Sequence, residues 1–545
     1  MSIRALTPSL RSSYDVSLLL LVGGIGAFVV AFARKFPSLA NSLTWNADLV
    51  SPMVIAESVA ATNGPHDVVF GTYAPYTSVW FNLLTRGLPF HREVWEAGSL
   101  VLSLLGVSLL VWVSWRLAGR WAALATLAIG VAWSQPVLIT LIAQAIHGTS
   151  YFVVCVLAAF LVFVAAQRRS LAVTGASTFG VGVLAGVNLA SDALLLLVGI
   201  APLVGAPLLA AIRCWTRGSR RALVVAAGAG ITAVVVATVT VAVMEAAGYR
   251  AMGVSEGSPL ALASFSDVLG NVGRLMENLL DIWSADFLGE EVTVTTVARA
   301  ILAPAALGVC ALPVALVVRT LRAPVREEEA RPERLYFLYW GLVVGALLAG
   351  MIFSELATEN GYRSVNYLTP VILAGAATLP LLASRARWSR VAAGVGIALL
   401  CTLSTVDLLV PPKVRPGVPA LAYVAEGATV LATLEGRNLR RGYSGYVSAS
   451  VFTYQSAGRL TVRPVFPCLL APDRPSVCGF FANRVAEWYT PHTGVPTFLI
   501  TDPSLPAGVA AAPAELGPPS EVIPIGVQTI YVYPYDIAAR FGPTF

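Results

Sequence analysis

Long apolar runs separated by short polar segments dominate the first 410 residues of this chain. A helix needs about 20 predominantly apolar residues to cross the hydrocarbon of a bilayer, because lipid offers no partner to an unpaired backbone group. Runs of that length predict about eleven membrane-spanning helices. We expect spans near residues 16–33, 99–117, 121–141, 151–167, 171–188, 193–212, 222–243, 298–318, 335–353, 366–383 and 390–410, with Asn188 and Asp192 interrupting the run from 171 to 212.

The pattern changes after residue 410. The segments "ATVLATLEG" and "QTIYVYPYDI" are rich in β-branched and aromatic residues, which predicts strands. The segment "YSGYVSASVFTYQSAGRLTVRPV" predicts a helix or turn, a stop at Gly458 and a further strand. The pattern therefore predicts a transmembrane domain over residues 1–410 and an α/β or mostly-β domain over residues 411–545.

Composition supports a membrane protein. The chain has 545 residues, of which 57% are hydrophobic and only 12% are charged. Soluble domains carry about 25% charged residues, so we predict a polytopic α-helical membrane protein with membrane lipids as partners. The net charge of +6 does not indicate a nucleic-acid partner, because most arginines lie in short segments between apolar runs. The sequence lacks a Walker-type phosphate loop, which leaves ATP-driven pumping without support.

The arginines also predict the orientation. Alternate loops carry clusters of arginine, and the positive-inside rule assigns that side to the cytoplasm. Arg34 and Lys35 lie on the opposite side, but the other loops outnumber them. The N-terminus is then cytoplasmic, and an odd number of spans makes the C-terminal domain extracytoplasmic. The clusters are Arg116 and Arg120; Arg168 and Arg169; Arg213, Arg217, Arg220 and Arg221; Arg319, Arg322, Arg326, Arg331 and Arg334; and Arg385, Arg387 and Arg390.

Two outer loops, residues 34–98 and 244–297, are too long to be simple connectors, and such loops usually carry function or are disordered. Their own apolar periodicity favours function.

In the tail, Cys468 and Cys478 flank a Pro-rich loop on the oxidising side of the membrane, so we predict a disulfide between them; two unpaired cysteines are the alternative.

The first outer loop begins with the segment "TWNADLVSP" (44–52). Ser51 is a good N-cap and Pro52 suits the first helical position, so we expect a helix from about Pro52 to Thr62. Its apolar residues recur at helical spacing, which suits a helix on the membrane surface. Asp48 would then lie just before this helix, at the boundary between water and lipid.

A carboxylate and an arginine at this boundary suit one reaction. A sugar carried on a polyprenyl phosphate presents its headgroup there, and its transfer to a hydroxyl needs a base and a cation for the departing phosphate. The segment "ENGYRSVNYLTPVI" leads from an outer loop into the tenth span and supplies Arg363. Asp48 and Arg363 are both predicted on the outer face. Asp48 as a solvated loop acid and Arg363 as an interfacial arginine remain the alternatives.

These features resemble the GT-C superfamily of integral-membrane glycosyltransferases, which take sugars from polyprenyl-phosphate donors. The resemblance lies in the acidic first outer loop with its following helix and in the Arg363, Tyr367 and Pro370 pattern that opens a late span. The tail segment "GYSGYVSASVFTYQSAGRLTVRPV" is similar to the outer domain of bacterial, chiefly actinobacterial, members. The resemblance implies a GT-C-like fold, Asp48 as general base and Arg363 on the donor phosphate. Members often have paired acids where this chain has Asn46, Ala47 and Asp48, so we expect no bound metal and no cofactor besides the lipid-linked donor.

Further polar residues are candidates for donor or acceptor binding, and each has a plainer explanation. Charged residues on an outer helix or in a turn are usually solvated, and tyrosines gather at membrane interfaces. Asp192 would be functional if it lay within a span, as intramembrane acids usually are. "SADFLGEE" (284–291) is predicted as a solvated stretch, with acceptor contact as the alternative. The candidates for substrate binding are Glu57, His66, Asp67, His147, Tyr362, Asn366 and Tyr367.

The sequence thus predicts a multi-pass membrane glycosyltransferase, a hexosyl- or pentosyltransferase that modifies a cell-envelope glycan, lipid or protein. A transporter or flippase of lipid-linked sugars is one alternative, although such proteins often show repeated halves that are not evident here. A non-catalytic scaffold that displays the tail domain is the other.

Overall fold

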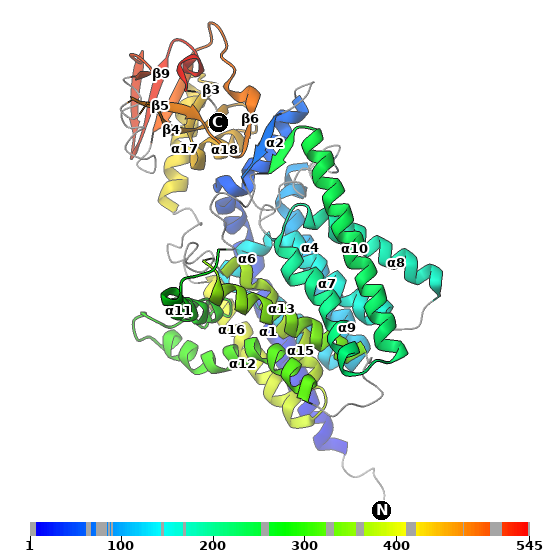
Figure 1. The fold of residues 1–545 in the computed structure, drawn as a ribbon. Coiled ribbons are helices and arrows are strands. Elements are labelled where there is room, and N and C mark those ends of the chain that lie inside the picture. Colours follow the sequence, from blue (N-terminus) through cyan, green and yellow to red (C-terminus); the bar gives the residue numbers. More distant parts are fainter. Residues whose placement is uncertain are drawn as a thin grey trace, which may run out of the picture. The chain divides into compact units, whose positions relative to one another are not determined.

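The computed structural model describes residues 7–61, 67–71, 84, 88, 91–142, 147–166, 170–251, 261–322, 332–355, 365–409, 421–471, 474–501 and 515–542. By the contacts among its residues the chain forms two compact units (Figure 1). Unit 1 comprises residues 1–37, 96–240 and 254–413, and unit 2 comprises residues 38–95, 241–253 and 414–545.

Unit 1 is helical, as the apolar runs predicted. Ten helices in the described residues are long and apolar enough to span a membrane, and a pair bent by 91° makes an eleventh if it is counted as one span. The bent pair is α5 (Arg120–Val131) and α6 (Gln135–Ile142). The others are α1 (Thr7–Leu43), α4 (His91–Ala118), α7 (Gly148–Phe160) with η2 (Leu161–Ala165), α8 (Leu171–Leu189), η3 (Leu196–Ile200) with α9 (Ala201–Arg213), α10 (Arg217–Ala246), α12 (Val294–Arg322), α13 (Pro332–Phe353), α15 (Val365–Ala383) and α16 (Arg387–Leu409).

Small residues let the central helices pack closely. Helix α15 is buried along most of its length and packs against α5, α12 and α13. A Cβ at Gly341 of α13 would lie 2.1 Å from the Cγ2 of Val317 and 2.5 Å from the carbonyl oxygen of Pro313 in α12. Only glycine fits at this contact, and small residues are what allow transmembrane helices to approach each other.

The run from 171 to 212 resolves into two spans with a short break. Helix α8 ends at Leu189, and η3 begins at Leu196. Asp192 therefore lies in the connector and not within a span. Its acidic side chain is nevertheless buried, so it needs a partner inside the protein.

The segment 244–297, predicted to be the second outer loop, contains an amphipathic helix that the sequence analysis did not identify, α11 (Phe265–Asp281). It packs against α12, α13 and α15 through one face. The opposite face exposes Phe265, Leu269, Val272 and Met276, a stripe with helical spacing. Such a stripe is typical of a helix that lies in the membrane interface.

Unit 2 is built around a six-stranded sheet with the strand order β5-β4-β3-β7-β9-β8. The unit β3–α18–β4 is a parallel crossover, and β3 also pairs in parallel with β7, whereas the remaining strands of this sheet pair antiparallel. The α/β alternative is therefore correct for the tail. The elements are α17 (Leu421–Gly436), β3 (Arg441–Gly445), α18 (Tyr446–Gln455), β4 (Thr461–Ala471), β5 (Arg474–Gly479), β7 (Thr497–Thr501), β8 (Glu521–Ile525) and β9 (Gln528–Tyr533).

Two predictions of local structure were wrong. The segment "ATVLATLEG" forms part of helix α17 and not a strand, because Val430 and Leu434 are spaced four residues apart and are both buried. Helix α2 (Ala47–Ala61) begins five residues before Pro52, because the Asn46 side chain accepts a hydrogen bond from Asp48 N and takes the capping role that we had given to Ser51.

Helix α2 also differs from the prediction in its surroundings. Its first ten residues are almost all buried, and it packs against α18 within unit 2, so it is not an amphipathic helix lying on a membrane surface.

Three distant segments meet in a second sheet, in which β1 (Val68–Phe70) pairs with β2 (Tyr249–Ala251) and β6 (Arg484–Val485). These contacts group parts of both outer loops with the tail, whereas the sequence analysis had grouped both loops with the transmembrane domain.

The disulfide predicted in the tail is present. Cys468 and Cys478 are bonded, with their Cα atoms 5.8 Å apart. They lie on the antiparallel strands β4 and β5, so the bond ties two neighbouring strands of the sheet.

We expect Gly427→Ala to lower the stability of unit 2 by about 1–3 kcal/mol, because inserting atoms into a packed contact forces side chains aside. A Cβ at Gly427 of α17 would lie 2.2 Å from Cζ3 of Trp45, in the first outer loop. Gly436→Ala at the end of the same helix is the matched control, because nothing lies within 4 Å of its Cβ position. Thermal unfolding of the full chain measures the difference, and equal melting temperatures for the two variants would contradict it.

Candidate functional site

Asp48 lies in the first turn of α2, the second residue of that helix. The positive end of the helix dipole favours a carboxylate at this position. Pro52 has no N–H to donate to the carbonyl of Asp48, four residues before it, so the first turn lacks that helical hydrogen bond. The N–H of Asp48 donates to Asn46 Oδ1 at 2.9 Å, which caps the start of the helix.

A tyrosine from the tail orients the carboxylate. The Tyr446 hydroxyl donates a hydrogen bond to Asp48 Oδ1 at 2.8 Å and accepts one from Asn483 Nδ2 at 2.7 Å. The ring stacks on Phe480, with the centroids 4.8 Å apart and the planes at 8°. Ser51 Oγ donates to Ser450 Oγ at 2.8 Å and fixes α2 against α18 beside this tyrosine. Asp48 Oδ1 is thus held by the Tyr446 hydroxyl, and Tyr446 is itself held by Asn483 and Phe480.

The surroundings keep Tyr446 protonated. Burial, and then the charge of Asp48, raise the pKa of the Tyr446 hydroxyl well above its ordinary value. Asp48 itself is exposed, and we find no hydrogen bond to its Oδ2 from the residues that the structure describes. The arrangement presents an exposed carboxylate that is oriented through one of its oxygens. Such a group can accept a proton from a bound hydroxyl.

A second polar cluster is buried in unit 1. His147 Nδ1 lies 2.7 Å from Asp192 Oδ2, and neither side chain has appreciable contact with solvent. Ser150 Oγ contacts the same carboxylate oxygen and lies 2.8 Å from Asn188 Oδ1. Leu194 N donates to the other oxygen of Asp192 at 3.0 Å. The connector between α8 and α9 is therefore bound to the start of α7.

The start of α15 belongs to the same cluster. The rings of His147 and Tyr367 lie 4.9 Å apart between centroids. Tyr151 donates to the carbonyl oxygen of Asn366 at 2.5 Å, and Thr140 donates to Asn366 Oδ1 at 2.7 Å. Of the candidates for substrate binding, His147, Asn366 and Tyr367 are thus brought together, and they make contacts within the protein.

The remaining candidates make other contacts or lie outside the described residues. Asp67 pairs with Arg250 on the surface, where an ion pair contributes about 0–1 kcal/mol. Glu57 lies on the exposed side of α2. Arg363, Tyr362 and His66 lie outside the described residues, so the convergence of Asp48 and Arg363 stays a prediction.

The described residues contain no group of three or more His, Cys, Asp or Glu side chains placed to hold one metal ion. The absence of a metal requirement therefore stays a prediction as well.

The sequence analysis missed several residues of these clusters, among them Tyr446, Asn483, Ser150, Tyr151 and Thr140. No spacing rule links Asp48 to a tyrosine 398 residues away. Ser150 follows His147 by three residues at the start of a helix, so the two lie on one helix face, and this spacing was the one local signal available.

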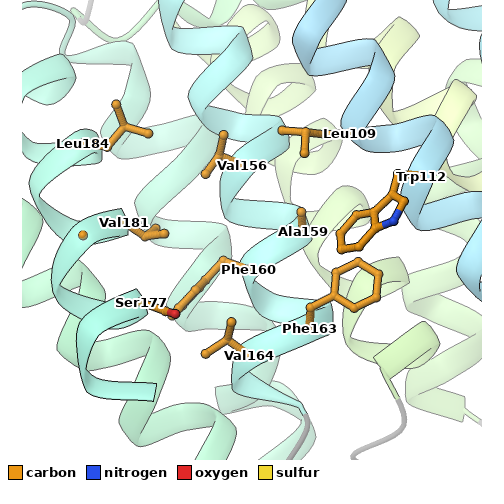
Figure 2. A pocket seen from close by; sticks show the side chains of 11 residues that line it. Leu109, Trp112, Val156, Ala159, Phe160, Phe163, Val164, Ser177, Val181 and Leu184 are labelled. Atoms are coloured by element: carbon orange, nitrogen blue, oxygen red, sulfur yellow. The ribbon is translucent and has the colours of Figure 1, made fainter. Parts of the chain in front are cut away.

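An apolar groove opens in unit 1 between α4, α7 with η2, and α8 (Figure 2). Its volume is about 450 Å³, and Ser177 is the only lining residue with a side-chain polar group other than the indole of Trp112. Trp112 lies against Phe163, with ring centroids 4.1 Å apart. The described residues that line the groove include no acid, base or cation, so the groove suits an apolar chain better than a catalytic step.

No family model and no curated protein matches the chain. Two solved structures are similar to it, both crystal structures of ArnT from Cupriavidus metallidurans. The apo structure is 16% identical with a TM-score of 0.45, and the structure bound to undecaprenyl phosphate is 14% identical with a TM-score of 0.44. Each comparison covers 95% of this chain and 99% of the other. Similarity at this level assigns no substrate and no residue role to this chain.

Proposed function

We propose that this chain is a membrane glycosyltransferase that moves a sugar from a polyprenyl-phosphate donor to an extracytoplasmic glycan, lipid or protein of the cell envelope. Asp48 is the general base, and Arg363 contacts the donor phosphate. The orientation is the one predicted from the arginines, with the N-terminus in the cytoplasm and the tail outside.

The observation that carries the proposal is the Asp48 carboxylate. Most residues around it in α2 are buried, yet this acid is exposed, and Tyr446 holds one of its oxygens at 2.8 Å. An acid that served only to stabilise the helix would not need a tyrosine, itself held by Asn483, to orient it. A fixed carboxylate with an open oxygen is what general-base catalysis requires.

The proposed step balances as a single displacement. The acceptor oxygen attacks the anomeric carbon, the bond from that carbon to the phosphate oxygen breaks, and the lipid phosphate leaves with the electron pair. The acceptor proton passes to Asp48 Oδ2. Arg363 would stabilise the charge of the departing phosphate, since its planar guanidinium binds two oxygens together. With one base and no covalent nucleophile, the step inverts the anomeric centre.

The experiment that tests the proposal uses purified protein in vesicles with a polyprenyl-phosphate sugar. A transferase forms a glycosylated product only when an acceptor is added. A transporter instead moves the lipid-linked sugar between leaflets in vesicles without acceptor, and a scaffold does neither. Mass spectrometry of the lipids that accumulate in a deletion strain identifies the donor to use. Movement without transfer would contradict the proposal.

Tyr446→Phe should lower kcat about tenfold, because a hydrogen bond to a charged group contributes about 1.5–3 kcal/mol. The variant leaves Asp48 without its orienting donor and keeps the ring stacked on Phe480. The raised pKa also predicts the pH profile: the wild-type phenol keeps its proton up to at least about pH 10, so no alkaline loss of activity below that pH should arise from Tyr446. An unchanged kcat in the variant would remove this tyrosine from the mechanism.

A further inference from the structure

Three buried N–H donors lie close together in unit 2, and none has a hydrogen-bond acceptor among the described residues. They are Arg441 Nε of β3, Arg463 Nη1 of β4 and Trp488 Nε1. Trp488 belongs to the 3₁₀ turn η5 (Ala486–Tyr489), and the Arg463 guanidinium lies over its ring, 4.1 Å from the centroid. Buried polar groups are nearly always paired, so an unpaired group points to a function or to an ion. These three donors share one chemistry, because each can bind an oxygen that carries negative charge.

The register of the sheet places both arginines on one face. Tyr443 of β3 pairs with Arg463 of β4, and Arg441 lies two residues before Tyr443. Side chains alternate between the two faces of a strand, so Arg441 and Arg463 project from the same face. Burial lowers the pKa of the Arg463 guanidinium to about 9, and the positive charge of Arg441 adds to this effect. The two arginines are therefore close enough for their charges to repel each other.

Asp536 is the acid beside Arg441, and its oxygens are already engaged. The Tyr443 hydroxyl donates to Asp536 Oδ1 at 2.9 Å, and His492 N donates to Oδ2 at 2.9 Å. Arg441 Nε lies 3.6 Å from Oδ2, which is an ion pair but is too long for a hydrogen bond. We find no carboxylate paired with Arg463 among the described residues. Two guanidinium groups thus share the charge of one carboxylate.

A guanidinium that is partly removed from water needs an anion nearby, because burying an unpaired charge is costly. Stacking on the Trp488 ring offsets part of that cost. The planar fork of an arginine fits two oxygens of a carboxylate or a phosphate at once. Arg441 keeps 20% of its side chain exposed, and Arg463 is half-buried, so an anion can reach them from solvent.

We propose that Arg441 and Arg463, with Trp488 against Arg463, form an anion-binding site on the tail sheet that takes a carboxylate or phosphate group. Arg441 is the first residue of β3, and Tyr446, which holds Asp48, follows the last. The anion site and the Asp48 carboxylate therefore lie toward opposite ends of one strand. The site goes beyond the proposed function and does not depend on sugar transfer.

The test is calorimetric titration of the full-length protein in detergent, in Tris chloride buffer, with inorganic phosphate and separately with sodium glucuronate. The wild type should bind at least one of the two anions, and the bound anion should raise the melting temperature. Tighter binding of phosphate assigns the site to phosphate groups, and tighter binding of glucuronate assigns it to acidic sugars. Binding of neither anion would overturn the proposal.

Arg463→Met removes the charge and keeps a long unbranched chain against Trp488. It should weaken anion binding about 10- to 100-fold, the loss expected for a hydrogen bond to a charged group. Without added phosphate or glucuronate its melting temperature should equal or exceed that of wild type, because an unpaired, partly buried charge has been removed. A lower melting temperature would assign Arg463 to packing on Trp488 and contradict the proposal. Unchanged anion binding would overturn it.

Arg441→Lys tests the site through its more exposed member. Lysine keeps the charge and loses the planar fork, so this variant should also bind more weakly, even if Arg463→Met does not fold. Arg459→Met is the matched control, because Arg459 lies four residues before Arg463 and pairs with Glu435 on the surface. It should bind the anion as wild type does. Binding by Arg441→Lys that equals this control, or an equal loss in Arg459→Met and Arg463→Met, would overturn the site.

Discussion

Asp48→Asn should lower kcat for sugar transfer by about 10²- to 10⁴-fold, the usual contribution of a general base. Asparagine has nearly the same shape and can still accept the Tyr446 hydrogen bond at Oδ1, so the local structure should persist. What it cannot do is take a proton from the acceptor hydroxyl. The measurement is the initial rate of transfer with saturating lipid-linked donor and acceptor.

The control for this variant is Glu435→Gln, which removes another carboxylate of unit 2. Glu435 pairs with Arg459 on the surface, so the Glu435→Gln variant should transfer sugar at the wild-type rate. Asp48→Asn should match this control in protein level and melting temperature. Transfer at more than about a tenth of the wild-type rate would mean that Asp48 is not the base.

Arg363→Lys should raise the KM for the donor about 10- to 100-fold, because a charge-assisted hydrogen bond contributes about 1.5–3 kcal/mol and lysine cannot replace the planar two-point contact. Lysine keeps the positive charge, so the loss reports the guanidinium geometry. Arg363 precedes Val365, the first residue of α15, by two positions. Titration of the lipid-linked donor against initial rate measures the effect.

Arg385→Lys is the matched control at the other end of α15. Arg385 follows the last residue of that helix and pairs with Glu333, so its replacement should leave the donor KM unchanged. Equal KM values for wild type and Arg363→Lys would remove Arg363 from the phosphate site. A rise in KM that appears equally in both lysine variants would also contradict the assignment.

The same proline effect recurs at the two polar clusters. Pro52 leaves the carbonyl of Asp48 without its helical partner, and Pro370 does the same for Asn366. In the second case Tyr151 replaces the missing donor. A proline in the second turn thus leaves one carbonyl of the first turn free to accept a hydrogen bond from outside the helix backbone. Both polar clusters contain such a carbonyl.

The sequence by itself determined the membrane spans and the elements with strong local signals. Span length is fixed by the thickness of the bilayer, so apolar runs predicted most of the helices almost as they are. The break of 91° between α5 and α6, within the span predicted over residues 121–141, was not predicted. The β-branched and aromatic residues of "QTIYVYPYDI" predicted the strand β9, and the short spacing of Cys468 and Cys478, on the side predicted to be oxidising, predicted their bond. Asp48 and His147 were identified as candidates from their residue type and their place beside a predicted span or helix.

Only the tertiary structure decided what these residues contact. The partner of Asp48 is Tyr446, 398 residues away, and the partner of His147 is Asp192, 45 residues away. The burial of α2 was decided in the same way, by packing against α18. Periodicity records which face of an element avoids water, and that is a local property. Which distant segment covers the face depends on how whole elements fit together, and no local pattern contains it.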